Sequence, residues 1–260
     1  MKTKLCLGLL FCLSIFISCS DDGASSIWLV YPEESIVFDN EARSVNLAPF
    51  SDGLTLVIKG GDGSYKAHVN NINKEVLSAD LKGNTLTLRP VEMGSVIVVI
   101  DDNSGNKYSL NVSVEYPSAT FTVIKLEAIV TGSDISVGDK KKLEDEILAS
   151  IPIEELGKYK FIYTDKTYQK GNIEIYKNSD ARAQDGTFVQ VTKQDESVSY
   201  LETTITVGQT NYVYEFGANV GLARNDMQVP MRFLEDVTDI YKEKYPAMEK
   251  AYAIQVLTRH

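Results

Sequence analysis

Alternation of apolar and polar side chains at every second residue constrains this chain more than any other feature of its sequence. The clearest case places four apolar residues in alternation: Tyr108, Leu110, Val112 and Val114. Because successive side chains of a β-strand point to opposite faces of its sheet, this pattern predicts a strand with one buried face. Similar short segments, separated by turns rich in glycine and asparagine, recur from Ile27 to Tyr116. We therefore expect residues 27–116 to form a small β-sandwich.

The remaining residues, 117–260, show both strand and helix periodicities after a joint at Tyr116-Pro117-Ser118-Ala119. Residues 139–150 predict one helix, and 231–245 predict a second through the spacing of Leu234, Val237, Tyr241 and Tyr245. Strands are expected before, between and after these helices, the last with Tyr252, Ile254 and Val256 facing inward. We expect an α+β domain with a mainly antiparallel sheet and two helices on one face. The fold class predicted for the whole chain is mixed.

Three segments of the first half carry a family resemblance: GGDGSYKAHV, LTLRP and SVIVVIDDNSGNKYSLNVSV. They are similar to a bacterial immunoglobulin-like (Big-type) module, and this resemblance implies an Ig-like sandwich that acts as a spacer, stalk or adhesion unit. The closing segment DVTDIYKEKYPAMEKAYAIQVL resembles C-terminal domains of uncharacterised Bacteroidetes lipoproteins. That second resemblance implies no activity.

The N-terminus has the pattern of an export signal, because Lys2 and Lys4 precede an apolar stretch too short to span a bilayer. Phe16-Ile17-Ser18-Cys19 resembles a bacterial lipobox, which implies a signal peptide over 1–18, a lipid on Cys19 and a polar tether over 19–26. The pair Asp21-Asp22 resembles the export signal of surface-exposed lipoproteins, so we expect an outer membrane lipoprotein. Orientation toward the periplasm and a plain secretory leader remain alternatives.

Composition excludes several classes of site and partner. All three cysteines lie within the first 19 residues, so the mature chain has no thiol for a disulfide, a nucleophile or a zinc site. The net charge of −10, spread evenly, argues against nucleic acid as a partner. Asp101-x-Asn103-x-Gly105 has partial calcium-loop spacing, but a hairpin turn explains it better. His68 is expected on the solvent face. We predict no metal and no cofactor.

Tyrosine is concentrated in the second half, which holds ten of the fourteen. Two rows at strand spacing are expected to fill the sheet core: Tyr159, Phe161 and Tyr163, and Tyr212, Tyr214 and Phe216. Tyr168 and Tyr200 lie outside a clear pattern and are the candidate ligand-contact residues. The segment 217–226 is expected to be a connector.

No catalytic constellation is found in the sequence, so we predict that the protein is not an enzyme. The leading hypothesis is a lipid-anchored cell-envelope protein in which an Ig-like spacer presents a C-terminal domain that binds a glycan, peptide or protein. The first alternative is a structural or adhesin subunit of an outer-membrane assembly. The second is a small hydrolase using paired carboxylates, for which Glu154, Glu155, Asp195, Glu196, Asp236 and Asp239 are available.

Overall fold

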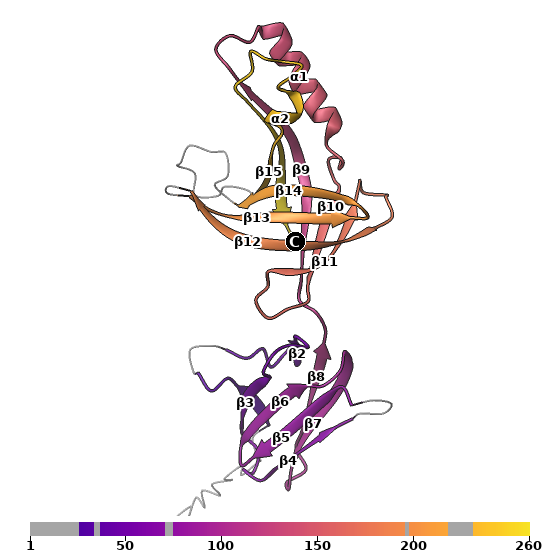
Figure 1. Ribbon diagram of the computed structural model, residues 1–260. Helices are drawn as coiled ribbons and strands as arrows, with labels where there is room; N and C mark the ends of the chain where they lie inside the picture. The colour runs from indigo at the N-terminus through magenta and orange to yellow at the C-terminus, as the bar shows by residue number, and fades with distance from the viewer. Residues whose placement is uncertain (1–25, 34–36, 71–74, 196–197, 218–230) are drawn as a thin grey trace, which may run out of the picture.

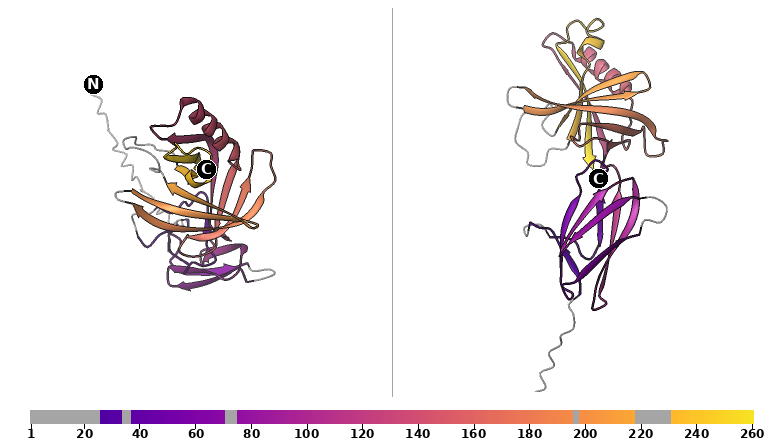
Figure 2. Two further views of the ribbon diagram at one scale, coloured as in Figure 1. Left: turned by 45° about the horizontal axis from the view of Figure 1, so that its top comes forward. Right: turned by 60° about the horizontal axis from the view of Figure 1, so that its bottom comes forward.

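The computed structural model describes residues 26–33, 37–70, 75–195, 198–217 and 231–260. These residues form a two-layered β-sandwich followed by a closed β-barrel, and the two bodies lie end to end (Figure 1). The C-terminus lies at the end of the barrel that faces the sandwich (Figure 2). The described chain is mostly β, with mainly antiparallel sheets and two helices. Neither helix combines the length and apolar character that crossing a membrane would require.

Two four-stranded sheets form the sandwich. The first has the order β1-β3-β6-β5, made by Trp28–Val30, Leu54–Lys59, Thr85–Pro90 and Leu77–Lys82. The second has the order β2-β8-β7-β4, made by Ser44–Leu47, Lys107–Val114, Gly94–Asp102 and Tyr65–Val69. All neighbouring strands are antiparallel except β2 and β8, which pair in parallel.

The alternating residues of β8 are confirmed as core. Tyr108, Leu110, Val112 and Val114 are each 1% exposed or less. They pack against inward-facing aliphatic residues of the other sheet, including Leu56. Full burial of such side chains contributes about 1.5–3 kcal/mol each, so the sandwich has a hydrophobic core of its own.

The turn at residues 101–105 is a hairpin turn, as the sequence favoured. Gly105 has φ = +89°, a left-handed conformation that glycine adopts without strain. The Asp102 carboxylate accepts hydrogen bonds from Asn106 N at 2.8 Å, Asn106 Nδ2 at 2.7 Å and Asp62 N at 3.1 Å. This carboxylate therefore joins two turns of the sandwich through N–H donors. His68 lies at the surface, as expected, with its side chain 67% exposed.

Eight antiparallel strands close the barrel in sequence order, and the last pairs with the first. They are β9 (Ser118–Thr131), β10 (Lys158–Tyr163), β11 (Lys170–Tyr176), β12 (Gln184–Asp195), β13 (Val198–Val207), β14 (Thr210–Gly217), β15 (Met231–Asp236) and β16 (Lys250–Arg259). Among the described residues each of these strands pairs with a neighbour on both sides, which limits the sheet edge that could aggregate.

Aromatic rings fill the barrel. Phe161, Phe188 and Phe233 are 1% exposed or less, and Phe161 lies 4.8 Å from Phe188 between ring centroids. Both predicted aromatic rows contribute to this core, with Tyr159 and Tyr214 at 2% exposure. The expectation that these rows are core is confirmed for Tyr159, Phe161, Tyr214 and Phe216, whereas Tyr163 and Tyr212 are half-buried against that core.

Helix α1 (Val137–Ser150) matches the predicted first helix closely. Ser136 caps its N-terminus, because the hydroxyl accepts a hydrogen bond from Asp139 N at 3.0 Å. Strands β9 and β16 continue beyond the barrel proper, and α1 covers this extension (Figure 1). Leu143 and Ile147 are fully buried there against Val130 and Ala251.

Two predictions for the second half are wrong. Residues 231–245 do not form one helix: they form β15 and then the short helix α2 (Thr238–Tyr241). The reason is that β14 and β16 each need a hydrogen-bonding neighbour, and 231–236 closes the barrel between them. The sheet is antiparallel, as expected, but it is a closed barrel and not a sheet with two helices packed on one face.

The orientation of the last strand also differs from the expectation. Gln255 and Leu257 point into the barrel, where Gln255 accepts a hydrogen bond from Tyr159 Oη at 2.8 Å. Because neighbouring side chains alternate, Ile254 and Val256 lie on the outer side of the wall in a separate cluster. Both faces of β16 are buried, so alternation in its sequence could not identify the inner face.

Candidate functional site between the sandwich and the barrel

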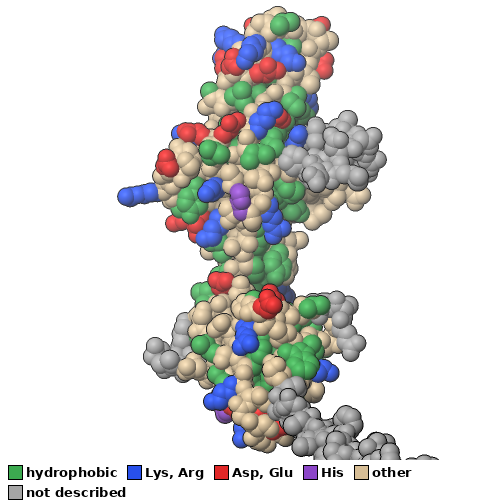
Figure 3. Space-filling model, turned by 180° about the vertical axis from the view of Figure 1, so that it is seen from behind, with side chains coloured by type: hydrophobic (Ala, Val, Ile, Leu, Met, Phe, Trp, Pro, Cys, Tyr) green, Lys and Arg blue, Asp and Glu red, His purple; other side chains and the backbone are tan. Residues whose placement is uncertain are grey.

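The connection between the two bodies is short and bonded on both sides. Strand β8 ends at Val114 and β9 begins at Ser118. Glu115 N donates to Leu47 O of the sandwich at 3.1 Å, and Pro117 O accepts from Tyr163 N of the barrel at 2.9 Å. Figure 3 shows the result as a narrow waist with hydrophobic side chains. The bodies are therefore held close enough to share a surface.

Tyr168 lies on the β10–β11 loop and faces the sandwich. Its ring makes an edge contact with Phe50, with ring centroids 5.7 Å apart. Tyr168 has φ = +55°, a conformation that costs a non-glycine residue roughly 1–2 kcal/mol. Asp165 holds this loop, because its carboxylate accepts from Thr167 Oγ1 at 3.0 Å and its carbonyl from Tyr168 N at 3.2 Å. Strain of this kind is concentrated at functional positions.

A cleft of about 550 Å³ lies at this junction. The sandwich, the connection and the β10–β11 loop all line it, through Tyr31, Val45, Asn46, Leu47, Ala48, Ser51, Gly53, Leu54, Glu115, Tyr116, Pro117, Ser118 and Tyr168. The volume falls within the range of about 300–1,000 Å³ that is usual for small-molecule sites. Three tyrosines in one cleft provide flat rings whose hydroxyls can also form hydrogen bonds.

One polar group in the cleft lacks a partner within the protein. Ser51 Oγ is buried and makes no hydrogen bond, although the residue lines the cleft. A buried hydroxyl without a partner costs free energy, so a ligand that supplied one after rotation of the Ser51 side chain toward the cleft would gain from the interaction. Asn46 and Glu115 add an amide and a carboxylate to the same lining.

The two tyrosines singled out in the sequence do not lie together. Tyr168 is 50% exposed in the cleft, whereas Tyr200 packs against the cluster of Leu234, Ile254 and Val256 on the outer wall of the barrel. The predicted connector at 217–226 falls almost entirely outside the described residues, as does the predicted lipidation site Cys19.

Sequence reasoning missed the other members of the cleft. Tyr31, Ser51 and Tyr116 come from segments without a distinctive pattern, and only the packing of the two bodies brings them near Tyr168. The proline and small residues at the joint were the one available signal, since they place the junction beside Tyr116.

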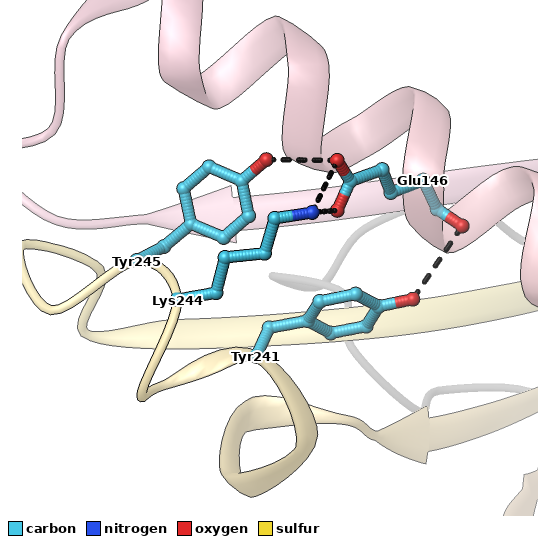
Figure 4. Close-up of polar contacts among 4 residues, drawn as sticks. All are labelled: Glu146, Tyr241, Lys244 and Tyr245. Carbon is cyan, nitrogen blue, oxygen red and sulfur yellow. Dashed lines mark hydrogen bonds and ion pairs between the residues drawn. The ribbon is translucent and has the colours of Figure 1, made fainter.

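The carboxylate of Glu146, on α1, lies in a cluster of polar contacts that has a structural role (Figure 4). Glu146 accepts hydrogen bonds from Lys244 Nζ at 2.7 Å and Tyr245 Oη at 3.0 Å, and its carbonyl accepts from Tyr241 Oη at 3.4 Å. The bond from Lys244 is the main reason that the pKa of Glu146 is lowered, with burial acting in the opposite direction. Glu146 thereby fastens α1 to the segment that follows α2.

Two of the carboxylates considered for hydrolysis are likewise held by neighbouring groups. Glu154 pairs with Lys177 at 3.2 Å, and Asp236 accepts from Lys250 Nζ at 2.9 Å. Glu115 is the carboxylate among the described residues that line the cleft. Across the described part of the chain, no group of three or more His, Cys, Asp or Glu side chains is arranged to hold a metal ion.

Comparisons with known proteins do not assign the chain to a family. No family model matches it, and no curated protein does. Among solved structures, domains 5–6 of the S-layer protein SbsC align with 74% of this chain and 96% of their own length, at 11% identity and a TM-score of 0.26. A similarity this weak supports no conclusion about fold or function.

Proposed function

We propose that this protein is a lipid-anchored, non-catalytic protein of the cell envelope that binds a short glycan in the cleft between its sandwich and its barrel. The observation that carries the proposal is the cleft itself, with three tyrosines and the unpaired Ser51 hydroxyl. Sugar rings offer C–H faces that stack on aromatic rings and hydroxyls that satisfy polar groups at the rim. A peptide or protein ligand is the alternative outcome of the binding test.

The sandwich would serve as the spacer. Its two sheets, β1-β3-β6-β5 and β2-β8-β7-β4, support an immunoglobulin-like module, because Ig domains divide their strands between two such sheets. The anchor would be Cys19 at the start of a polar tether over 19–26, and two or more acyl chains would hold the protein stably at a membrane. The ligand site would then lie beyond the spacer, away from the bilayer.

Glycan-array screening of the mature chain, followed by calorimetric titration of the best glycan, tests the binding proposal. Tyr168→Ala should abolish measurable binding because it removes the exposed ring. Ser51→Ala should weaken binding by about 2–10-fold without loss of stability, since its hydroxyl makes no bond within the protein. Trp28→Ala is the matched control, because Trp28 is 40% exposed but lies outside the cleft.

Two results would contradict these assignments. Unchanged glycan affinity in Tyr168→Ala would show that the glycan does not bind in the cleft. Fractionation of cells tests the anchor separately: Cys19→Ala should move the protein from the membrane to the soluble fraction, and a variant that still sediments with membranes would exclude a lipid on Cys19.

A further inference from the structure

A second cavity lies at the end of the barrel remote from the sandwich. It has a volume of about 80 Å³. The start of β10, β12 and β14 and the end of β11 and β13 meet at this mouth and line the cavity. The lining residues on these strands are Tyr159, Ile175, Gln184, Ile205, Val207, Tyr212 and Tyr214. Pro152, Ile153 and Lys177 complete the lining. The cavity therefore sits inside one rim of the barrel, separate from the cleft that contains Tyr168.

The cavity lies at the mouth of the barrel. Below it the interior is filled, because Phe161, Phe188 and Phe233 are at most 1% exposed and pack against one another. Protein interiors are normally packed to the density of organic crystals, and a gap loses the contacts that its lining atoms would otherwise make. The interior of an eight-stranded barrel is wide enough either to be filled by side chains or to hold one small ligand, and here the unfilled space lies at the mouth.

A strap formed by residues 151–157 crosses the mouth between α1 and β10. Glu154 N donates to Lys177 O at 2.8 Å, and Leu156 N donates to Val123 O at 2.8 Å, so the strap is bonded to both sides of the rim. Ile153 points from it into the barrel and is 1% exposed. A Cβ at Gly157 would lie 2.6 Å from Lys177 O, which shows how closely the strap is packed against the rim.

Backbone strain occurs in the same strap. Leu156 has φ = +69° although it carries a branched side chain, and that side chain is 59% exposed. Such a conformation persists only where the surrounding bonds impose it, here the hydrogen bonds of Leu156 N and Gly157 O with Val123. The strap thus closes the mouth in a conformation that its own sequence does not favour.

The chemistry of the lining defines the class of ligand. Ile153, Ile175, Ile205 and Val207 provide an apolar wall. The Tyr159 hydroxyl within the wall is already bonded to Gln255 Oε1 at 2.8 Å, and Lys177 at the rim is paired with Glu154 at 3.2 Å. Because the rim charge is compensated, a charged ligand would gain little there. The Gln184 amide, at the exposed start of β12, suits a hydroxyl or carbonyl group.

We infer that the mouth of the barrel, beneath the strap 151–157, binds a small uncharged molecule with one apolar group of a few carbon atoms and one hydroxyl or carbonyl group. An engineered apolar cavity of about 150 Å³ holds benzene or xenon, so about 80 Å³ suits xenon or a short aliphatic group whose polar end reaches the rim. This site is independent of the proposed glycan cleft.

Methyl NMR of the full mature chain tests this inference with xenon and with n-butanol as probes. Both should produce saturable shifts confined to the methyl groups of Ile153, Ile175, Ile205 and Val207. Val207→Phe should fill the cavity and weaken binding at least tenfold. Val213→Phe is the matched control, because Val213 is 49% exposed and lies outside the lining, and it should bind as the wild type does.

The wild-type titration decides the matter even if Val207→Phe fails to fold. The absence of saturable shifts with both probes would overturn the inference, and so would equal binding by a folded Val207→Phe. Repeating the titration with Tyr168→Ala separates the two sites: probe binding should persist in this variant whether or not glycan binding is found.

Discussion

Replacing Phe233 with alanine should destabilise the barrel and leave the sandwich unaffected. The Phe233 ring is fully buried, with its centroid 4.7 Å from that of Tyr214 and 5.0 Å from those of Tyr159 and Phe216. Truncation of a core phenylalanine costs about 3–5 kcal/mol, and aromatic pairs contribute ~0.5–1.5 kcal/mol each beyond their buried area. Phe161 forms a fourth pair at 6.3 Å, and with all four pairs lost we expect a decrease of about 4–5 kcal/mol in the free energy of unfolding of the barrel.

The sequence supplies a separate optical probe for each body. Trp28 is the single tryptophan and lies in the sandwich, whereas ten of the fourteen tyrosines lie in the second half. In guanidinium unfolding, tryptophan fluorescence should report the sandwich, and near-ultraviolet circular dichroism should be dominated by the barrel tyrosines. Phe233→Ala should lower the midpoint of the second signal without moving the first, at an unchanged denaturant slope.

Leu110→Ala is the matched control in the other core. Leu110 is fully buried in the sandwich, and its truncation should cost about 2–5 kcal/mol and move only the fluorescence midpoint. If either variant shifts both midpoints equally, the two bodies unfold as one cooperative unit and the argument from separate cores is refuted.

Three further predictions concern buried or paired carboxylates. Glu146→Gln should lower Tm at neutral pH, because the bond from Lys244 lowers the pKa of Glu146 below its ordinary value of 4.5 and the ionised carboxylate therefore stabilises the fold above that pH. The difference in Tm between variant and wild type should shrink as the pH falls below 4.5. A difference that stays constant with pH would contradict this. Burial raises the pKa of Glu235 above its ordinary value of 4.5, so the ionisation of Glu235 opposes folding as the pH rises above that value. Glu235→Gln should therefore raise Tm at neutral pH and leave it unchanged at about pH 4. A lower Tm of the variant at neutral pH would refute this prediction. Asp102→Ala should lower the midpoint of the unfolding transition followed by Trp28 fluorescence, because three N–H donors of two turns lose their acceptor. An unchanged midpoint would show that water replaces the carboxylate.

The sequence predicted local structure well where one face of an element is buried. Strand β8 and helix α1 both follow their apolar spacing, since each has a core side and a solvent side. The same criterion is less informative for the apolar run of β7, in which Ile97 is 42% exposed between the buried Val96 and Val98. A run of β-branched residues therefore predicts a strand more securely than it predicts burial on both sides.

Prediction failed where tertiary pairing decides the outcome. The spacing of Leu234, Val237 and Tyr241 fits a helix, yet the first lies in a strand because barrel closure requires one there. Barrel closure itself depends on the pairing of β9 with β16, which are more than a hundred residues apart in sequence. No local pattern carries that information.

The candidate site was predictable only in part. Tyr168 stood out because it lies outside a clear strand pattern, and it does line the cleft. Ser51 could not have been singled out, since its interest comes from a buried hydroxyl without a partner. A cleft made between two bodies requires their relative placement, which the composition of either one does not determine.

The parallel pairing of β2 with β8 has a mechanical consequence. Its register runs from Ser44 opposite Asn111 to Leu47 opposite Val114, and β8 continues directly into the barrel. If the protein were pulled between its N-terminal side and its barrel, these two strands would be drawn past each other along their length. Their hydrogen bonds would then bear the force together and not break one by one, so the sandwich should resist extension better than a pair of strands peeled apart from one end.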